Sequence, residues 1–338
     1  MVDHVFERLM FSPHADMDAS APHHPKNLQP VPWDTGDEPR VTIDSWSFLG
    51  IGRPLPQVAS VIVTWTAAEW EAMCDVLAPN STEFQYTTNF SSYAADLTVR
   101  SPARFAKCLA RYRAVIGPNN TTVLLMHSML HVATDGPNLP LRQLFNQIIE
   151  ETSCKKIITT GTAGGIGADK ELGDIVVGDA CQFNCHRTFK SQPFNGVRYP
   201  TTLPPQAKST IPLVAANFGQ LSAVNKGGFR VDAGDIETTD FFAFDTSTDH
   251  FGLQQADPKA NIVEMDDAVL GLVMADRMTA AKSVPLWGAV RNVSDPQANM
   301  SNYATFEDAS RDMGRIYRRY GFWTTIPSVI ESWLMAIQ

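Results

Sequence analysis

The sequence predicts an α/β domain in which a β-sheet lies between two layers of helices. From Ser60 onward, short apolar runs alternate with stretches in which apolar residues recur at helical spacing. The chain has 338 residues, of which 44% are hydrophobic and 19% charged, enough for one large domain or two modest ones. No internal repeat is visible. We therefore expect one three-layer α/β/α sandwich over residues 58–338, with residues 1–57 as an appended arm.

The arm is rich in proline. Eight of the 22 prolines fall within residues 1–57, and the only short run that predicts a strand lies near residues 41–46. Four large apolar side chains are too many for a solvated linker: Trp33, Trp46, Phe48 and Leu49. We expect the arm to lie on the body of the protein or on a neighbouring subunit.

The remaining elements follow from the spacing of apolar residues. Short apolar runs predict strands at Ser60–Thr64, Thr121–His127, Lys156–Thr160, Asp174–Gln182, Phe229–Ala233, Ile262–Glu264 and Leu286–Val293. Helical spacing predicts helices at Ala67–Leu77, Ala103–Val115, Leu141–Glu150, Ile211–Leu221, Asp267–Thr279 and from about Phe306 onward. This alternation of strands and helices is typical of a largely buried sheet.

The charge balance argues against nucleic acid as a partner. The chain has 27 Lys and Arg against 36 Asp and Glu, a formal net charge of −9, and no basic cluster that would bind nucleic acid.

The sequence also indicates where the protein is expected to be found. Asp3 and Glu7 stand where a signal peptide needs basic residues, and no run approaches the ~18 apolar residues of a membrane span. Five cysteines, an odd number, argue against a disulfide framework. We expect a cytoplasmic protein without a metal or other cofactor.

Residues that could carry chemistry are concentrated in four segments. A glycine-rich segment, residues 159–166, follows an apolar run and is expected to be a loop that lets backbone approach a flat ligand. Residues 173–179 read Gly-Asp-Ile-Val-Val-Gly-Asp. Residues 263–268 place three acids at the start of an apolar helix, where Asp266 and Asp267 could simply cap it. Residues 289–296 are expected to form a buried strand that ends in Ser-Asp-Pro, although Asp before Pro is also a natural helix start.

In this order and at these separations, the four segments resemble the purine nucleoside phosphorylase superfamily. The likeness is greatest to its hydrolytic branch, the 5′-methylthioadenosine/S-adenosylhomocysteine nucleosidases, and extends from about Ser60 to Phe306. The resemblance implies a central mixed β-sheet flanked by helices and a small-molecule nucleoside as substrate. It also implies a homodimer or higher homo-oligomer, in which the arm could cover a neighbouring pocket.

The resemblance implies a role for two carboxyl groups in catalysis. Asp295 would protonate the departing purine, which requires a carboxyl that keeps its proton near neutral pH. Glu69 would activate a water molecule on the opposite face of the sugar. The alternative for Glu69 is structural, because Thr66 and Glu69 also have the spacing of a capping box at a helix start.

Other positions are expected to bind the substrate. Met265 and Asp266 occupy the positions that contact the ribose in the resembled family, and Glu264 could contact the sugar or act as a structural charge. Glu237 stands where the family has an aromatic residue that stacks on the base. The remaining expected contacts are Thr162, Ala163, Gly164, Arg291 and Ser294.

Three departures from the family pattern bear on the substrate and the nucleophile. Asp266 replaces a glutamate and is one methylene shorter, which puts the identity of the sugar in question. The arginines that clamp phosphate in phosphorylases are replaced by Thr159 and the uncharged residues 64–68, so water is the favoured nucleophile. His127 and His131 replace the usual glycine turn and could line the pocket or simply pack. We expect a nucleosidase; a phosphorylase or a non-catalytic nucleoside-binding protein is the alternative.

Overall fold

The computed structural model describes residues 28–41, 54–79, 85–86, 93, 95 and 97–338. Most of the proline-rich arm, including Trp46, Phe48 and Leu49, lies outside the described residues. The strand expected near residues 41–46 begins within them, because β1 (Arg40–Val41) pairs antiparallel with β4. The rest of that expected strand also lies outside the described part of the chain.

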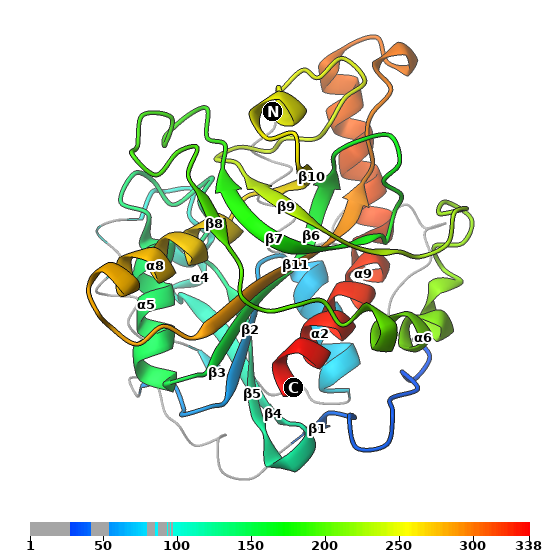
Figure 1. The fold of residues 1–338 in the computed structure, drawn as a ribbon. Helices are drawn as coiled ribbons and strands as arrows, with labels where there is room; N and C mark the ends of the chain where they lie inside the picture. The colour runs from blue at the N-terminus through cyan, green and yellow to red at the C-terminus, as the bar shows by residue number, and fades with distance from the viewer. Residues whose placement is uncertain (1–27, 42–53, 80–84, 87–92, 94, 96) are drawn as a thin grey trace.

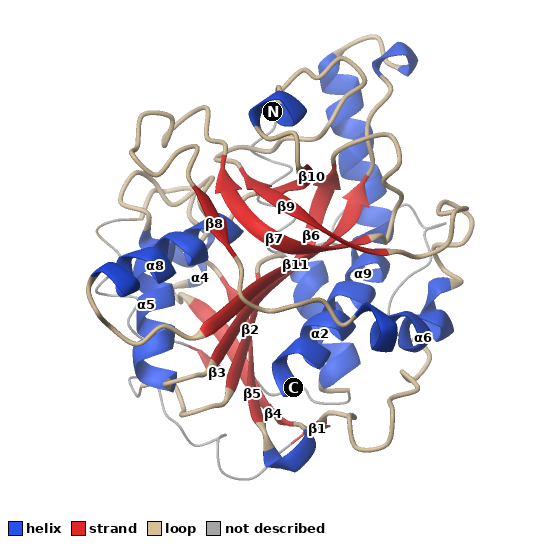
Figure 2. Ribbon diagram, viewed as in Figure 1, coloured by secondary structure: helices blue, strands red, loops and turns tan. Residues whose placement is uncertain are grey.

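The described strands form a mixed sheet (Figure 2). They are β1, β2 (Ser60–Thr64), β3 (Gln85–Tyr86), β4 (Ala110–Ile116), β5 (Thr122–Ser128), β6 (Lys156–Gly165), β7 (Ile175–Phe183), β8 (Arg198–Pro200), β9 (Val231–Thr238), β10 (Ala260–Glu264) and β11 (Leu286–Asp295). β2 runs parallel to β5 and β6, whereas β4 runs antiparallel to β5. The predicted α/β class and mixed sheet are confirmed, and each of the seven predicted strands corresponds to an observed one.

Part of the sheet closes on itself. β6 pairs with β10, β10 with β9, β9 with β7, β7 with β11, and β11 again with β6. The first half of β6 lies between β2 and β11, while Gly164 and Gly165 at its end pair with β10. β2 and β11 each run parallel to β6. The carboxyl ends of these three strands therefore meet at one edge of the closed ring.

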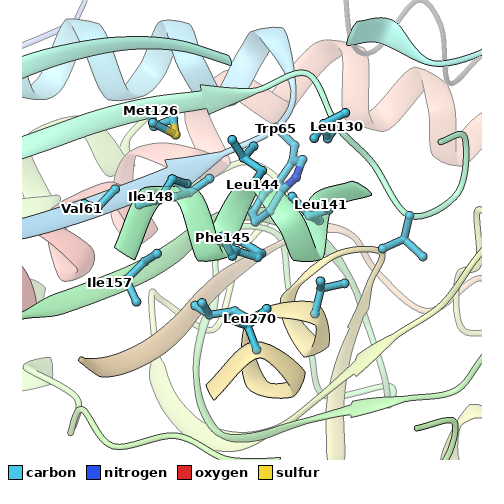
Figure 3. Packing of buried hydrophobic residues seen from close by; sticks show 14 of the residues in the cluster. Val61, Trp65, Met126, Leu130, Leu141, Leu144, Phe145, Ile148, Ile157 and Leu270 are labelled. Atoms are coloured by element: carbon cyan, nitrogen blue, oxygen red, sulfur yellow. The ribbon is translucent and has the colours of Figure 1, made fainter. Parts of the chain in front are cut away.

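Helices pack against both faces of the sheet because its strands alternate their side chains. Figure 1 shows α5 (Pro140–Thr152) and α8 (Asp267–Thr279) on one side, and α2 (Ala67–Leu77), α6 (Ala207–Phe218) and α9 (Phe306–Ile337) on the other. In β2, Val61 belongs to the apolar cluster with α5 and α8, as Figure 3 shows, whereas the next residue, Ile62, belongs to the cluster with α2 and α9. The short helices are α4 (Pro102–Ala106) and α7 (Leu253–Ala256).

One predicted helix is wrong. Residues 103–115 were expected to form a helix, but α4 ends at Ala106 and the chain continues as strand β4 from Ala110. Lys107, at φ 52°, turns the chain out of the helix, and β4 then pairs along its whole length with β5. Tertiary pairing therefore overrides the local helical spacing.

The described part of the arm packs on the body. Leu28, Val31 and Trp33 contact the apolar cluster around α9, and the Trp33 ring meets that of Trp333 with centroids 6.5 Å apart. The indole N–H of Trp333 donates a hydrogen bond to the carbonyl of Asp37 over 2.7 Å. Within the described ranges, none of the helices combines the length and apolar character needed to cross a membrane.

Candidate active site

A pocket lies where β2, β6, β10 and β11 end. It is lined by Trp65, Thr66, Glu69, His131, Thr162, Ala163, Gly164, Thr239, Phe242, Ala243, Val263, Glu264, Met265, Asp266, Arg291, Ser294, Asp295 and Tyr317. All the expected site residues except Glu237 are in this lining. The glycine-rich segment expected to be a loop is instead the buried end of strand β6.

Glu69 both caps helix α2 and lines the pocket. Its Oε2 accepts hydrogen bonds from the hydroxyl of Thr64 at 2.7 Å and the backbone N–H groups of Trp65 and Thr66 at 2.9 and 2.8 Å. The Thr66 hydroxyl accepts from the Glu69 N–H in return, which completes the capping box. Oε1 points to β6 and accepts from the N–H and hydroxyl of Thr162 at 2.7 and 2.6 Å. The capping alternative is therefore correct, and it coexists with a place in the pocket.

These contacts hold Glu69 in its charged form. Burial alone would raise the pKa of its carboxyl, but the charge of Arg291 and the hydrogen bonds from Thr162 and Thr66 lower the pKa overall. Gly161 makes the approach of Glu69 to β6 feasible: it has φ +151°, and an added Cβ would lie 2.5 Å from the Glu69 carboxyl carbon and 2.9 Å from Arg291. A glycine is therefore required at this position of β6.

Arg291 is the buried cation at the centre of the acidic cluster. Its Nε donates to Asp267 at 2.8 Å, and one terminal nitrogen lies 2.5 Å from Asp267 and 3.1 Å from Glu264. The other terminal nitrogen lies 4.0 Å from Glu69, and the guanidinium carbon lies 4.8 Å from the centroid of the Trp65 ring. The guanidinium is thus already engaged by protein carboxylates.

Asp295 has a different environment from Glu69. It ends β11 opposite Gly164, and its Oδ1 accepts a 2.8 Å hydrogen bond from the Ser294 hydroxyl. Its Oδ2 is buried and has no hydrogen-bond partner among the described residues. Burial raises the pKa of this carboxyl to about 6, against the opposing effect of the Ser294 hydrogen bond. No helix begins at Asp295, so the capping alternative for this residue is wrong.

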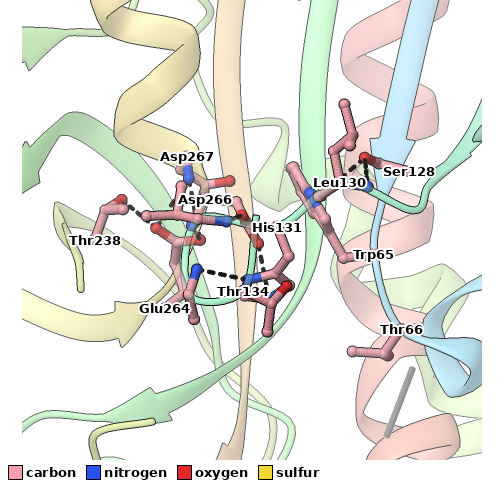
Figure 4. Close-up of polar contacts among 12 residues, drawn as sticks. Trp65, Thr66, Ser128, Leu130, His131, Thr134, Thr238, Glu264, Asp266 and Asp267 are labelled. Atoms are coloured by element: carbon pink, nitrogen blue, oxygen red, sulfur yellow. Dashed lines mark hydrogen bonds and ion pairs between the residues drawn. The ribbon is translucent and has the colours of Figure 1, made fainter. Parts of the chain in front are cut away.

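Glu264, rather than Asp266, caps the start of helix α8. Asp266 occupies the N-cap position of α8, but its side chain makes no capping bond; the Glu264 carboxylate accepts the N–H groups of Asp266 and Asp267 instead. The Thr238 hydroxyl also donates to Glu264. Figure 4 shows Asp266 turned toward His131. Burial, together with the charges of neighbouring acids, raises the pKa of both carboxyls.

Glu237 is the one expected site residue outside the pocket lining. It lies on β9, fully buried, with Oε2 accepting a 2.9 Å hydrogen bond from the side-chain amide of Asn184 and Oε1 without a described partner. Burial and the charges of nearby aspartates raise its pKa to about 8. The observed position therefore does not support the expected contact between Glu237 and a base.

Sequence reasoning did not include several lining residues. Tyr317 reaches the pocket from α9, and its hydroxyl lies 2.6 Å from that of Thr66. Trp65 and Thr66 follow β2 directly, so the position of Glu69 could have indicated them. Tyr317 is separated from Thr66 by 251 positions and carried no motif that would identify it. His131 lines the pocket, whereas His127 is buried beside it with Nε2 2.6 Å from the Trp65 carbonyl.

The pocket is nearly filled by its own side chains. Its cavity volume is about 60 Å³, enough for a few water molecules and far below the ~300 Å³ at which ligand pockets begin. Most lining residues are buried, but Thr66, Phe242 and Met265 are only half-buried. A ligand of nucleoside size must therefore displace side chains. The Thr66 hydroxyl is held by contacts with Glu69 and Tyr317, so we expect Phe242 and Met265 to be the least constrained of the three.

Several solved structures are similar to this chain. The futalosine hydrolase of Helicobacter pylori is similar to this chain with a TM-score of 0.48 and 13% identity, covering 83% of this chain and 97% of that one. The 5′-methylthioadenosine/S-adenosylhomocysteine nucleosidases of H. pylori and Neisseria meningitidis give TM-scores of 0.48 and 0.45 at 13% and 15% identity, covering 82% and 81% of this chain and 97% and 100% of theirs.

The family assignment rests on the sequence itself. A search of curated proteins found no match. A family model described as the phosphorylase superfamily matches residues 94–320, which is more than half of the chain and contains all four segments described above. The chain belongs to the phosphorylase superfamily.

Proposed function

We propose that the protein is a nucleosidase that hydrolyses the N-glycosidic bond of a purine nucleoside, with or without a modified 5′ position, and releases free base and sugar. One observation carries the proposal: Asp295 and Glu69 line the same pocket, and their environments shift their pKa values in opposite directions. A general acid and a general base that act together require two carboxyl groups whose pKa values are shifted apart in this way.

Asp295 is suited to be the acid. Its buried, unpartnered Oδ2 can hold a proton toward a ring nitrogen of the base, so that the base departs as a neutral molecule. Gly164 leaves room beside this oxygen, because a Cβ there would lie 3.0 Å from Oδ2. A side chain at position 164 would fill the space that the base needs.

Glu69 is suited to orient and deprotonate water, provided that one of its hydroxyl donors turns away. Both of its oxygens accept hydrogen bonds, but two of the donors are the hydroxyls of Thr64 and Thr162. Rotation of a hydroxyl needs no backbone movement, and Thr162 lines the pocket. Water that donates to Glu69 would then replace the Thr162 hydroxyl at Oε1.

The charges in the lining favour water over phosphate as the nucleophile. Among the lining residues that the structure describes, Arg291 is the one guanidinium and no lysine is present. Asp267 and Glu264 already occupy its donors. A phosphate ion would enter a pocket rich in carboxyl groups with no available bidentate cation.

The direct test is a chromatographic assay of purified protein against purine nucleosides, including 5′-thio and deoxy forms, with and without phosphate. The proposal predicts free base and reducing sugar at a rate independent of phosphate. Release that requires phosphate and yields a sugar phosphate would make the protein a phosphorylase. Ligand binding without release from any nucleoside would indicate a non-catalytic binding protein of the same fold.

A further inference from the structure

Two of the departures from the family pattern meet in the pocket. His131 follows β5, and Asp266 precedes α8, 135 positions later. The His131 Nε2 lies 3.1 Å from Asp266 Oδ2, and the backbone N–H of the neighbouring Val132 donates to Oδ1 over 3.0 Å. The β5 loop therefore contacts both oxygens of the shortened carboxylate, as Figure 4 shows for His131.

The hydrogen bonds of His131 define which ring nitrogen carries the proton. The N–H of Ala133 donates to Nδ1 over 3.3 Å, so Nδ1 presents its lone pair. The neutral ring then carries its proton on Nε2, the nitrogen that faces Asp266. The His131 N–H donates to Asp135, which holds this turn of the loop in place.

The pair thus offers a donor and an acceptor at one point of the pocket wall. Each of the two side chains is only 3% exposed, and each lines the same pocket. A carboxylate alone can only accept hydrogen bonds, whereas a carboxylate next to an imidazole N–H can accept one and donate one. A hydroxyl group can donate one hydrogen bond and accept another, and so fits this pair.

We propose that His131 is a specificity-determining residue that, together with Asp266, recognises one hydroxyl group of the substrate sugar. The hydroxyl donates to Asp266 and accepts from His131 Nε2, and so replaces the direct contact that the two side chains make with each other. This assignment rests on the proposed function, because it names the sugar hydroxyl as the ligand group. A deoxy or O-methyl sugar at that position leaves a buried donor or acceptor unpaired and is rejected.

The test crosses two variants with matched substrates. For wild type, His131→Phe and His131→Gln, kcat/KM is measured for a ribonucleoside and its 2′-deoxy and 3′-deoxy forms. Phe keeps a ring without a donor, and Gln can place an amide N–H near the position of Nε2. We expect wild type to discriminate against one deoxy form by at least about tenfold, His131→Phe to lose most of that discrimination, and His131→Gln to retain part of it.

The outcomes separate this inference from the proposed function. If His131→Phe lowers kcat/KM equally for the hydroxyl and deoxy substrates, His131 only supports the fold of the loop and the inference is wrong. If wild type cleaves no nucleoside, the proposed function fails, and the same comparison is made by calorimetric binding of the ribo and deoxy compounds. Equal affinity for both, or binding of neither, overturns the hydroxyl recognition as well.

Discussion

At the scale of single residues, the proposed function depends on the proton of Asp295. Burial raises the pKa of this carboxyl to about 6, so the acid form persists well above the ordinary aspartate range and is lost as the pH rises further. We expect kcat/KM for base release to fall with increasing pH on a titration near pH 6. Ser294→Ala removes the hydrogen bond that opposes this shift, so the titration should move to higher pH. An unchanged pH profile in that variant would mean that the titrating group is not Asp295.

Asp295→Asn provides the second test at this scale. The amide keeps the shape of the side chain but cannot act as an acid, so we expect turnover to fall by several orders of magnitude while the protein remains folded. Because the folded state favours the neutral carboxyl, the amide should leave the free energy of unfolding at pH 8 equal or higher. Urea unfolding checks the stability and single-turnover release of base checks the rate. A small loss of rate would assign the acid to another group.

At the scale of elements, strand β6 joins the helix cap to the pocket. Gly161→Ala would place a Cβ 2.5 Å from the Glu69 carboxyl carbon at a backbone φ of +151°. We expect a loss of more than about 2 kcal/mol in the free energy of unfolding, together with loss of activity. The matched control is Gly219→Ala at the end of α6, where nothing lies within 4 Å, and which should change stability by less than about 0.5 kcal/mol. Equal effects of the two substitutions would contradict the crowding at Gly161.

The secondary-structure elements also show which features the sequence could predict and which it could not. Strand ends such as Glu264 and Asp295 were predictable, because apolar runs and adjacent acids identify them locally. The closure of β6, β10, β9, β7 and β11 into a ring was not, since it depends on β6 pairing with different partners along its length. Tyr317 and the His131–Asp266 pair were missed for the same reason: they are assembled by tertiary packing across more than a hundred positions.

At the scale of the whole molecule, we expect the described arm to contribute to stability through Trp33. Its ring packs on Trp333 of α9, whose indole also bonds to the arm backbone at Asp37. Trp33→Ala should lower the free energy of unfolding by about 1–2 kcal/mol, because the side chain is only partly buried. Val99→Ala, at a side chain that is 86% exposed, is the control. The measurement is the midpoint of unfolding in urea. If Trp33→Ala and wild type have the same midpoint, this part of the arm does not hold its position on α9 in solution.

Buried titratable groups also determine how the stability of the whole molecule varies with pH. Burial lowers the pKa of His127 to about 4 and that of His131 to about 3, so both resist protonation in the fold, and stability falls as the pH drops below their ordinary value of 6.5. Glu237 acts in the opposite direction. Burial raises its pKa from 4.5 to about 8, so the stability associated with its neutral form is lost as the pH rises to about 8.

Between about pH 7.5 and 8 both histidines are neutral in the folded state and almost entirely neutral in the unfolded state, so buried carboxyl groups such as Glu237 dominate the change. We expect the free energy of unfolding to fall across this interval, with one such group contributing up to about 1.4 kcal/mol per pH unit. Glu237→Gln should flatten the fall, whereas Glu307→Gln, on an exposed side chain, should leave its slope unchanged. Urea titrations at closely spaced pH values measure both slopes. An equal slope in wild type and Glu237→Gln would mean that Glu237 is ionised in the fold throughout this range, and that its burial beside Asn184 is compensated by contacts formed in solution.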